Sequence, residues 1–411
     1  MSALFSKGSS RPAGRLVAYI GSYGNAAEPE AGGIHVLGVS PDGSELTALG
    51  HVREPLEAGY LVHAPSLGTL YAVDERKNDG RGPVAPAART HALSIDPRDG
   101  SLRNLNSQLA PGPRPTFLDV DEQRKLLLTA NHGDFQHVER VVRNADGEWV
   151  SEYVYDDSTV ILYRLEDDGR VGQILDLKVF GGHGTDPNGS PQNGGHAQAS
   201  AHAHCAVIDP SGRYVLVCDK GTDRIYVFSL GNTLEPAFTY QCEPETGPRH
   251  VAFDPTTGTA FVTYEFSSEL ASFAFDSASG ALHPLDRTST LETGFTGPNE
   301  PAEVRVHPGG RFVYVNNRGE DSVAWFSIGP EGRLERKGHV GIAKSIHPGL
   351  AARNFTFDPT GSFVLVADRP AHLVRSYAVD TEDGSLHPLT TVRVLDPAFV
   401  AIVELPPLDA L

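Results

Sequence analysis

Short runs of apolar residues, separated by turn residues, fill the chain from Leu16 onward. The first three runs span residues 16–23, 33–40 and 45–52, and Pro, Gly, Asp and Asn separate those that follow. No window keeps a helical period of apolar positions through several turns. Short, evenly spaced strands with turn residues between them are typical of all-β proteins. Residues 1–14 are small and polar and are expected to form a flexible tail.

One unit of this pattern recurs along the chain. It consists of an apolar strand, a turn built on Asp-Pro or His-Pro, a second apolar strand, a polar loop and a third strand, after which a fourth short strand follows. The clearest copies are 205–230, 250–276, 303–328 and 354–379, and weaker copies are 60–97 and 115–165. Four strands repeated roughly every 45 to 55 residues are typical of propeller blades.

The two ends of the chain supply a seventh unit. The N-terminal runs correspond to strands two to four of a blade, and the run at 398–405 supplies its missing first strand. We therefore predict an all-β fold, a seven-bladed β-propeller with four antiparallel strands per blade, closed by N- and C-terminal strands in one blade. Such closure leaves no unpaired sheet edge. A single domain is expected over residues 15–411.

Two insertions interrupt the repeat. One spans about 134–157 inside the third blade, and the other spans about 181–201 before the fourth. Both are interpreted as loops rich in Gly, Asn and His. Long loops in a compact fold are often functional lids.

Aligning the copies on their turns defines two positions that should meet at one mouth of the central channel, because antiparallel neighbours start and end at the same edge. The position before the first strand is occupied by Gly59, Thr116, His204, Arg249, Ala302 and Arg353. The position ending the second strand is occupied by Glu75, Asn131, Asp219, Glu265, Asn317 and Asp368. The residues that follow it are Arg76, His132, Lys220, Phe266, Arg318 and Arg369.

Each of these polar positions has a structural alternative. Asn and Asp after a strand commonly cap turns by bonding backbone N–H groups, an alternative that applies to Asn131, Asp219, Asn317 and Asp368. Glu is a poor turn former, so Glu75 and Glu265 require a partner such as Arg. Arg249 and Glu265 are expected to be spatial neighbours, acting either as an ion pair or on a ligand.

The histidines allow a metal site only weakly. His202 and His204 lie at a strand start, and zinc would need a third ligand from His183, Asp186 or His196. There is no H-E-x-x-H spacing and no dense carboxylate cluster, so no metal and no cofactor are expected. There is also no G-x-S-x-G elbow and no glycine-rich phosphate loop.

Composition restricts the possible partners. Lys plus Arg is 34 and Asp plus Glu is 52, which gives a formal charge of −18. Such a surface repels nucleic acid and anionic membranes, and an anionic substrate would need a local cluster of Arg or Lys. Three cysteines do not form a disulfide framework, and no secretory or membrane-spanning segment is apparent. A cytoplasmic location is therefore expected.

Several segments together match a known family. The chain resembles the seven-bladed lactonase propellers, which include the bacterial 6-phosphogluconolactonases of the non-classical type and the fungal carboxy-cis,cis-muconate lactonising enzyme. The matching segments are YIGSYG, GGIHVLGVSPDGSELTALG, LYAVDE, LLLTANHG, QASAHAHCAVIDP from Gln198, DKGTDRIYVFSL, GPRHVAFDP, VYVNNRGEDSVAWFSI and RNFTFDPTGSFVLVAD. The resemblance runs from about Leu16 to Leu405. Two departures are Ala197-Gln198, where the family usually has Arg-Gln, and a longer 181–201 loop.

The resemblance implies a ring-opening hydrolase or a cycloisomerase that acts at the channel mouth without a metal. The family's acid–base and anion-binding groups correspond to His204, Arg249, Glu265 and Arg318. The other residues predicted to bind substrate at this rim are Glu75, Asn131, His132, His202, Asn317 and Arg353.

Three functions follow as hypotheses. The first is hydrolysis of a sugar lactone, with Glu265 or His204 as the base, Arg249 stabilising the oxyanion, and Arg318 and Arg353 holding an anionic group. The second is cycloisomerisation of a muconate-type diacid, and the third is a binding propeller without catalysis. The expected partner is a small molecule, either a sugar lactone or a related organic acid. A monomer or weak homo-oligomer is expected.

Overall fold

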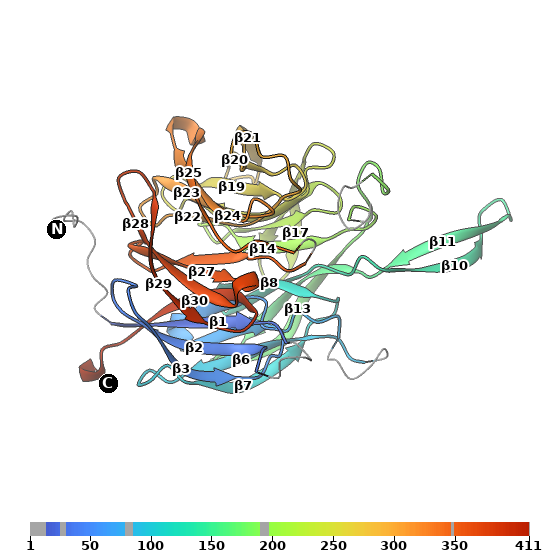
Figure 1. Ribbon diagram of the computed structural model, residues 1–411. Coiled ribbons are helices and arrows are strands. Elements are labelled where there is room, and N and C mark those ends of the chain that lie inside the picture. The colour runs from blue at the N-terminus through green and yellow to red at the C-terminus, as the bar shows by residue number, and fades with distance from the viewer. Residues whose placement is uncertain (1–13, 25–29, 79–84, 190–196, 347–348, 411) are drawn as a thin grey trace.

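Seven four-stranded antiparallel sheets surround a central channel in the computed structural model of this chain (Figure 1). The structure describes residues 14–24, 30–78, 85–189, 197–346 and 349–410. Helical structure in these ranges is limited to three-residue 3₁₀ turns such as η1 (Pro65–Leu67), and they contain no helix long and apolar enough to span a membrane. The predicted all-β, seven-bladed propeller is confirmed.

The blades are numbered from the N-terminus, with their strands given from the channel outward. Blade 1 contains β30 (Pro397–Leu405), β1 (Arg15–Ser22), β2 (Gly33–Val39) and β3 (Leu46–Val52). Blade 2 contains β4 (Leu61–Ala64), β5 (Thr69–Val73), β6 (Arg89–Ile95) and β7 (Leu102–Leu109). Blade 3 contains β8 (Pro115–Asp121), β9 (Leu126–Asn131), β12 (Ser158–Leu165) and β13 (Val171–Phe180). Blade 4 contains β14 (Ala203–Ile208), β15 (Tyr214–Asp219), β16 (Arg224–Leu230) and β17 (Leu234–Gln241). Blade 5 contains β18 (Pro248–Phe253), β19 (Thr259–Tyr264), β20 (Glu269–Phe275) and β21 (Leu282–Ser289). Blade 6 contains β22 (Glu300–Val306), β23 (Phe312–Arg318), β24 (Ser322–Ile328) and β25 (Leu334–Gly341). Blade 7 contains β26 (Asn354–Phe357), β27 (Phe363–Asp368), β28 (Leu373–Val379) and β29 (Leu386–Arg393).

The ring closes in blade 1, as the sequence predicts. Strand β30 pairs antiparallel with β1 along its length, from Arg15 opposite Leu405 to Ser22 opposite Pro397. The innermost strand of blade 1 therefore comes from the C-terminal end of the chain, and the other three come from the N-terminal end. This pairing closes the ring of seven blades.

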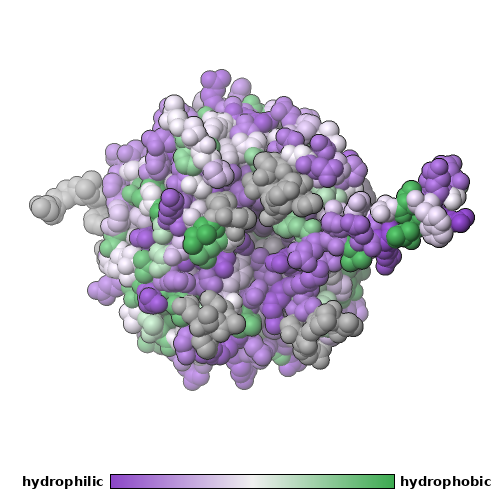
Figure 2. Space-filling view, turned by 45° about the vertical axis from the view of Figure 1, so that its right-hand side comes forward, coloured by the Kyte–Doolittle hydropathy of each residue, from purple (hydrophilic) through white to green (hydrophobic). Residues whose placement is uncertain are grey.

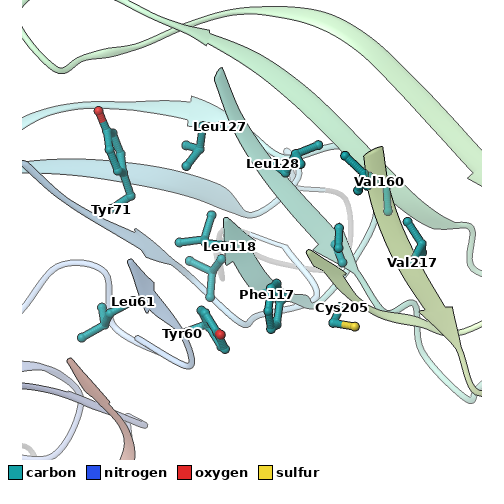
Figure 3. Close-up of a cluster of buried hydrophobic side chains, with 14 of the residues drawn as sticks. Tyr60, Leu61, Tyr71, Phe117, Leu118, Leu127, Leu128, Val160, Cys205 and Val217 are labelled. Atoms are coloured by element: carbon teal, nitrogen blue, oxygen red, sulfur yellow. The ribbon is translucent and has the colours of Figure 1, made fainter. Parts of the chain in front are cut away.

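The second strand of a blade is apolar along nearly its whole length because neighbouring blades cover both of its faces. Every residue of β5, β9, β15, β19 and β27 is buried. Figure 3 shows Tyr71, Leu128, Val160 and Val217, from blades 2 to 4, in one such cluster. The fourth strands β21 and β29 mix buried and exposed positions because one face meets solvent.

Tyrosines on second strands join neighbouring blades. Each hydroxyl donates to a backbone carbonyl in the outer turn of the next blade, and the pairs are Tyr19 to Gly100 at 2.9 Å, Tyr71 to Gly169 at 2.8 Å, Tyr214 to Ala278 at 2.9 Å and Tyr314 to Gly384 at 2.6 Å. A buried hydroxyl needs such a partner, so these bonds fix the register between blades. The accepting turns need left-handed backbone, and Gly100 and Gly384 have φ of 77° and 80°.

The two insertions differ from the prediction of loops. Within 134–157, β10 (His137–Arg143) and β11 (Trp149–Tyr155) form an antiparallel hairpin that extends away from the propeller (Figure 1). The loop prediction is therefore wrong here, because β-branched and aromatic residues flank the tight turn Asn-Ala-Asp-Gly at 144–147. Part of the second insertion, 190–196, lies outside the described residues.

Deleting β30 tests the role of closure. A chain ending at residue 396 lacks the partner of β1, so it should be insoluble or lack a cooperative thermal transition in far-ultraviolet circular dichroism. A matched chain ending at residue 405 keeps the whole of β30 and should unfold like the full-length protein. Cooperative unfolding of the shorter chain near the full-length midpoint would contradict this account.

Candidate active site

One mouth of the channel collects the four residues predicted to act in catalysis. His204 lies on β14, Arg249 on β18 and Arg318 at the end of β23, while Glu265 directly follows β19. These strands belong to blades 4, 5 and 6, and all four residues are less than 9% exposed. Their first and second strands are antiparallel neighbours, which is why the alignment of the repeats selected the same mouth.

Glu265 is the centre of an ion-pair cluster. Its Oε1 lies 2.8 Å from Lys220 Nζ, and its Oε2 lies 2.8 Å from Arg249 Nε and 3.2 Å from Arg318 Nη2. The predicted proximity of Arg249 and Glu265 is confirmed. Arg318 also lies 3.1 Å from Glu300 Oε2. Lys220 and Glu300 were absent from the predicted site residues, although Lys220 occupies the position after a second strand.

The charges around Glu265 determine its protonation. Burial alone would raise the pKa of the Glu265 carboxyl, but the charges of Lys220, Arg318 and Arg249 outweigh burial and hold that pKa well below its usual value. Glu265 is therefore ionised at neutral pH and is a poor general base. Burial lowers the pKa of Arg249 to about 10, so its guanidinium also stays charged.

Arg249 keeps one donor available. Its Nη1 is buried and has no hydrogen-bond partner within the ranges that the structure describes. A buried donor without a partner carries a desolvation cost, which an anionic ligand would remove.

A row of three buried side chains leads from this mouth into the channel. His204 Nδ1 lies 3.1 Å from His250 Nε2, and His250 Nδ1 lies 3.5 Å from Glu303 Oε2. Asn354 Nδ2 donates to the same Glu303 oxygen at 2.8 Å. These residues come from the first strands of blades 4 to 7.

The protonation of this row follows from its last member. Burial would raise the pKa of Glu303, but Arg305 and His250 outweigh it and hold that pKa at about 2. Burial, followed by the charge of Arg249, lowers the pKa of His250 to about 4, so the ring is neutral near pH 7. An ionised carboxylate can only accept a hydrogen bond, so Glu303, 3.5 Å from His250 Nδ1, favours the tautomer of His250 with its proton on Nδ1, although the two atoms form no hydrogen bond in this geometry.

The tautomer of His204 is coupled to that of His250 through the contact between the two rings. With Nδ1 protonated, His250 Nε2 is an acceptor, and the facing Nδ1 of His204 must carry the proton between them. The Nε2 of His204 is then unprotonated and carries a lone pair. Burial, followed by the charges of Arg249 and His250, lowers the pKa of His204 well below its usual value, so this neutral form persists at neutral pH.

Sequence reasoning missed His250, Glu303 and Asn354, although a signal for them exists. They occupy the position immediately after Arg249, Ala302 and Arg353 in the aligned copies. The same position in other blades contributes Tyr60, Phe117 and Phe399, whose rings pack together with centroids 4.1 to 4.3 Å apart. Reading one residue further along each first strand would have identified this second layer of the channel.

Two cavities lie above and below this layer. A small cavity of about 20 Å³ is lined by residues that include His204, Arg249, His250, Glu75 and Arg353. A larger cavity of about 520 Å³ lies toward the far ends of the first strands, and Tyr60, Glu303 and Phe399 border both.

Glu75 and Arg353, predicted to bind substrate, form a second group. Arg353 Nη1 lies 3.2 Å from Glu75 Oε1 and 2.7 Å from the Tyr23 hydroxyl, which donates to Glu75 Oε2 at 2.5 Å. The predicted need of Glu75 for an arginine partner is confirmed. Tyr23 was not predicted.

The remaining predicted residues are buried beside the mouth. His132 and His202 stack with ring centroids 4.5 Å apart, and His202 is fully buried. Asn131 Nδ2 donates to the carbonyls of Ala110, Pro111 and Gly112, and Asn317 Nδ2 donates to Thr290 O. Both amides thus have a structural role, but their Nδ2 groups bond backbone carbonyls and not the backbone N–H groups of the turn-capping alternative. A substrate contact for any of these four residues stays a prediction.

The described residues form no cluster of metal-binding side chains. Among the described residues, no group of three or more His, Cys, Asp or Glu is placed to hold a metal ion. His196, one of the possible third ligands, lies outside the described residues.

Comparison with known proteins places this chain in a family. The family model described as "Lactonase, 7-bladed beta-propeller" matches residues 17–402. The chain belongs to this lactonase family. The 6-phosphogluconolactonase of Bacillus subtilis is 27% identical over 395 residues, which cover 95% of this chain and 99% of that protein.

Solved structures of similar proteins share the fold. The periplasmic gluconolactonase of Pseudomonas aeruginosa superposes with a TM-score of 0.78 at 24% identity, covering 95% of this chain and 100% of that one. A putative 6-phosphogluconolactonase of Bacteroides fragilis gives a TM-score of 0.76 at 22% identity, covering 95% and 98%. The lactonase propeller described here therefore matches these chains over nearly their full lengths.

Replacing Glu265 tests the ion-pair cluster of this lactonase propeller. The Glu265→Gln variant leaves three buried cations without their shared anion, so unfolding free energy at pH 7 should fall by roughly 3–5 kcal/mol. The folded pKa of Glu265 is lowered, so its stabilisation is present above the unfolded pKa, near 4.5. The difference between wild type and variant should shrink as pH falls below that value, as measured by urea unfolding. A difference that stays constant between pH 7 and pH 3 would contradict the assignment.

Proposed function

We propose that this chain hydrolyses the lactone of an anionic sugar acid, as a 6-phosphogluconolactonase does, with His204 as the general base. The observation that carries the proposal is that one small cavity is lined by His204 and by Arg249, whose Nη1 has no hydrogen-bond partner among the described residues. Hydrolysis needs a base for water and a cationic donor for the oxyanion, and both groups border the same small cavity. Membership of the lactonase family supports this reaction class.

The proposed reaction begins in that cavity. A volume of about 20 Å³ has room for about one water molecule, which would be the nucleophile. His204 Nε2 removes a proton as the water oxygen bonds to the lactone carbonyl carbon, and Arg249 stabilises the resulting oxyanion. When the tetrahedral intermediate collapses, the ring C–O bond breaks and the imidazolium returns its proton to the leaving alkoxide. The product is the open hydroxy acid.

Glu265 has a different role in this proposal. Its low pKa makes it unsuitable as the base, so we assign that role to His204 and not to Glu265. Glu265 instead positions Lys220, Arg249 and Arg318 in a water-poor site. These cations outnumber the carboxylates in contact with them, Glu265 and Glu300, which favours an anionic substrate within an acidic protein.

The substrate class follows from the same excess of positive charge. The relative from Bacillus subtilis is named for a phosphorylated lactone. We propose that Arg318 and Arg353 hold the phosphate or carboxylate of the substrate, where the planar guanidinium can bind two oxygens.

A lactone panel with matched histidine variants tests the proposal. Wild type is assayed by proton release on 6-phosphogluconolactone, gluconolactone and an unphosphorylated γ-lactone, with the phosphorylated compound expected to give the highest kcat/KM. His204→Asn should lower kcat by about 10²- to 10⁴-fold because it removes the base. His283→Asn is the control, since His283 is exposed on β21 and should retain wild-type rates.

Two results would overturn the proposal. One is His204→Asn retaining wild-type activity on every lactone. The other is wild type that opens no lactone but bleaches the ultraviolet absorbance of a carboxy-muconate, which would identify the cycloisomerase of the second hypothesis.

Replacing Glu303 tests how His204 is held in its reactive tautomer. A neutral amide can donate to His250 Nδ1 as well as accept from it, so the Glu303→Gln variant no longer fixes either ring. We expect kcat to fall on the order of 10²-fold or more with little change in KM, because Glu303 is separated from the mouth by His250.

Nitrogen-15 spectra of the histidines distinguish positioning from a general loss of structure. His204 Nε2 should be an unprotonated, pyridine-type nitrogen in wild type, and a mixture of tautomers should appear in Glu303→Gln. Asn354→Ala serves as a comparison because it removes a bond to Glu303 but leaves its charge. A His204 that carries its proton on Nε2 in wild type would contradict the assignment even if lactones are hydrolysed.

A further inference from the structure

The hairpin of β10 and β11, called the arm below, has no role in the proposed chemistry. Its strands pair only with each other among the described strands, and it extends away from the blades (Figure 1). Val141 is 75% exposed, Trp149 66%, Val138 64% and Tyr153 55%. Figure 2 shows hydrophobic and hydrophilic patches interspersed along the arm. An isolated two-stranded hairpin is marginally stable in water, and apolar residues gathered on a projection indicate a binding surface.

The base of the arm is fixed to the propeller. Lys77 of blade 2 lies 2.6 Å from Asp156 and 3.7 Å from Asp134, the residues that flank the arm. Arg114 lies 3.6 Å from Asp134 on the other side. Contacts to both ends of the insertion orient the arm, so it can present one edge to a partner.

The backbone geometry shows which groups that edge presents. The Asn144 N–H donates to Glu148 O at 2.9 Å at the tip, so this pair is hydrogen-bonded. Hydrogen-bonded and non-hydrogen-bonded pairs alternate in an antiparallel hairpin. The backbone N–H and C=O groups of Glu139, Val141 and Arg143 therefore point away from β11, toward the open edge of β10.

We propose that the arm is a dimerisation element, in which β10 pairs antiparallel with β10 of a second copy about a two-fold axis through Val141. The outward backbone groups of Glu139, Val141 and Arg143 then bond across the axis, which completes a four-stranded sheet. The antiparallel arrangement places the two propellers at opposite ends of this sheet, so they do not collide.

Charge selects this register. With Val141 facing its own copy, Glu139 of each chain lies opposite Arg143 of the other on the same face of the sheet, and cross-strand pairs of opposite charge are stabilising. A register centred on Arg140 would place two arginines opposite each other, and the backbone groups of Arg140 face β11. An isologous interface must be self-complementary in this way.

The overall charge also favours a second copy at the arm. The chain carries a formal charge of −18, so two propeller bodies repel each other. The strands of the arm contain Glu139, Arg140, Arg143 and Glu152, whose charges cancel. Association through the β10 strands of two arms keeps the acidic bodies apart.

The proposal can be tested by sedimentation equilibrium of the full chain and of variants in which the charges at residues 139 and 143 are reversed. Wild type should be a dimer, and the single reversals Glu139→Arg and Arg143→Glu should each weaken the dimer by about tenfold or more, since like charges then face each other twice. The double reversal restores both pairs and should return the dimer to near wild-type strength. Arg143 also stacks on Trp149, with 4.6 Å from its Cζ to the ring centroid. This contact is lost in Arg143→Glu and in the double reversal, and it is kept in Glu139→Arg.

A backbone variant gives an independent test of the edge. Val141→Pro removes an N–H that does not bond β11, so the hairpin can persist while pairing across the axis is blocked. The variant should be monomeric with an unchanged thermal midpoint of the propeller. A wild type that is monomeric at every concentration would overturn the proposal, including the case in which the arm binds another protein or residues 1–13. A dimer insensitive to these substitutions, or one lost and not restored by the double reversal, would also overturn it.

Discussion

The pairing of β30 with β1 is the constraint on which the rest of the molecule depends. Because the first and last strands share one sheet, the seven blades form a closed ring, and each blade packs against two neighbours. The tyrosine bonds between second strands and the outer turns of the next blade fix how far one blade can slide along another. The starts of all first strands therefore lie at one mouth, whatever side chains they carry.

This constraint explains why the repeat in the sequence predicts so much of the site. The position of a residue within its repeat determines how far along the channel axis it lies. His204, Arg249 and Arg353 could therefore be assigned to one mouth without a structure. The proximity of Arg249 and Glu265 followed from the same reasoning. Side-chain length then separates residues at equivalent positions. Asn131 and Asn317 are short and bond carbonyls of neighbouring loops, whereas Glu265 reaches cations from blades 4, 5 and 6.

The features that the sequence did not predict depend on packing across the channel. Aligning the repeats shows how far along the channel each residue lies, but it does not show which residues touch across the channel. Tyr60, Phe117 and Phe399 pack together, and His250 and Glu303 form a separate polar contact. The number of cations that contact Glu265 was equally out of reach. The arm was missed for a different reason. Apolar and polar residues occur together on both faces of its two strands, so residues 137–155 show no alternation with a period of two that would mark them as strands.

The two buried carboxylates of the channel show how one fold assigns different tasks to the same chemical group. Both Glu265 and Glu303 have lowered pKa values and stay ionised, so neither can remove a proton at neutral pH. Glu265 contacts permanent cations and concentrates positive charge at the mouth. Glu303 lies beside a neutral histidine, and in the proposed mechanism its charge determines which nitrogen holds the proton.

A buried ion cluster is rarely the most stable way to fill a core, and apolar side chains of similar volume are often as good or better. Stability alone therefore does not account for three cations around Glu265 at the open end of a row of histidines. The arrangement is accounted for if the mouth must attract an anion and leave one nitrogen of His204 free, which are the two requirements for opening an anionic lactone with water.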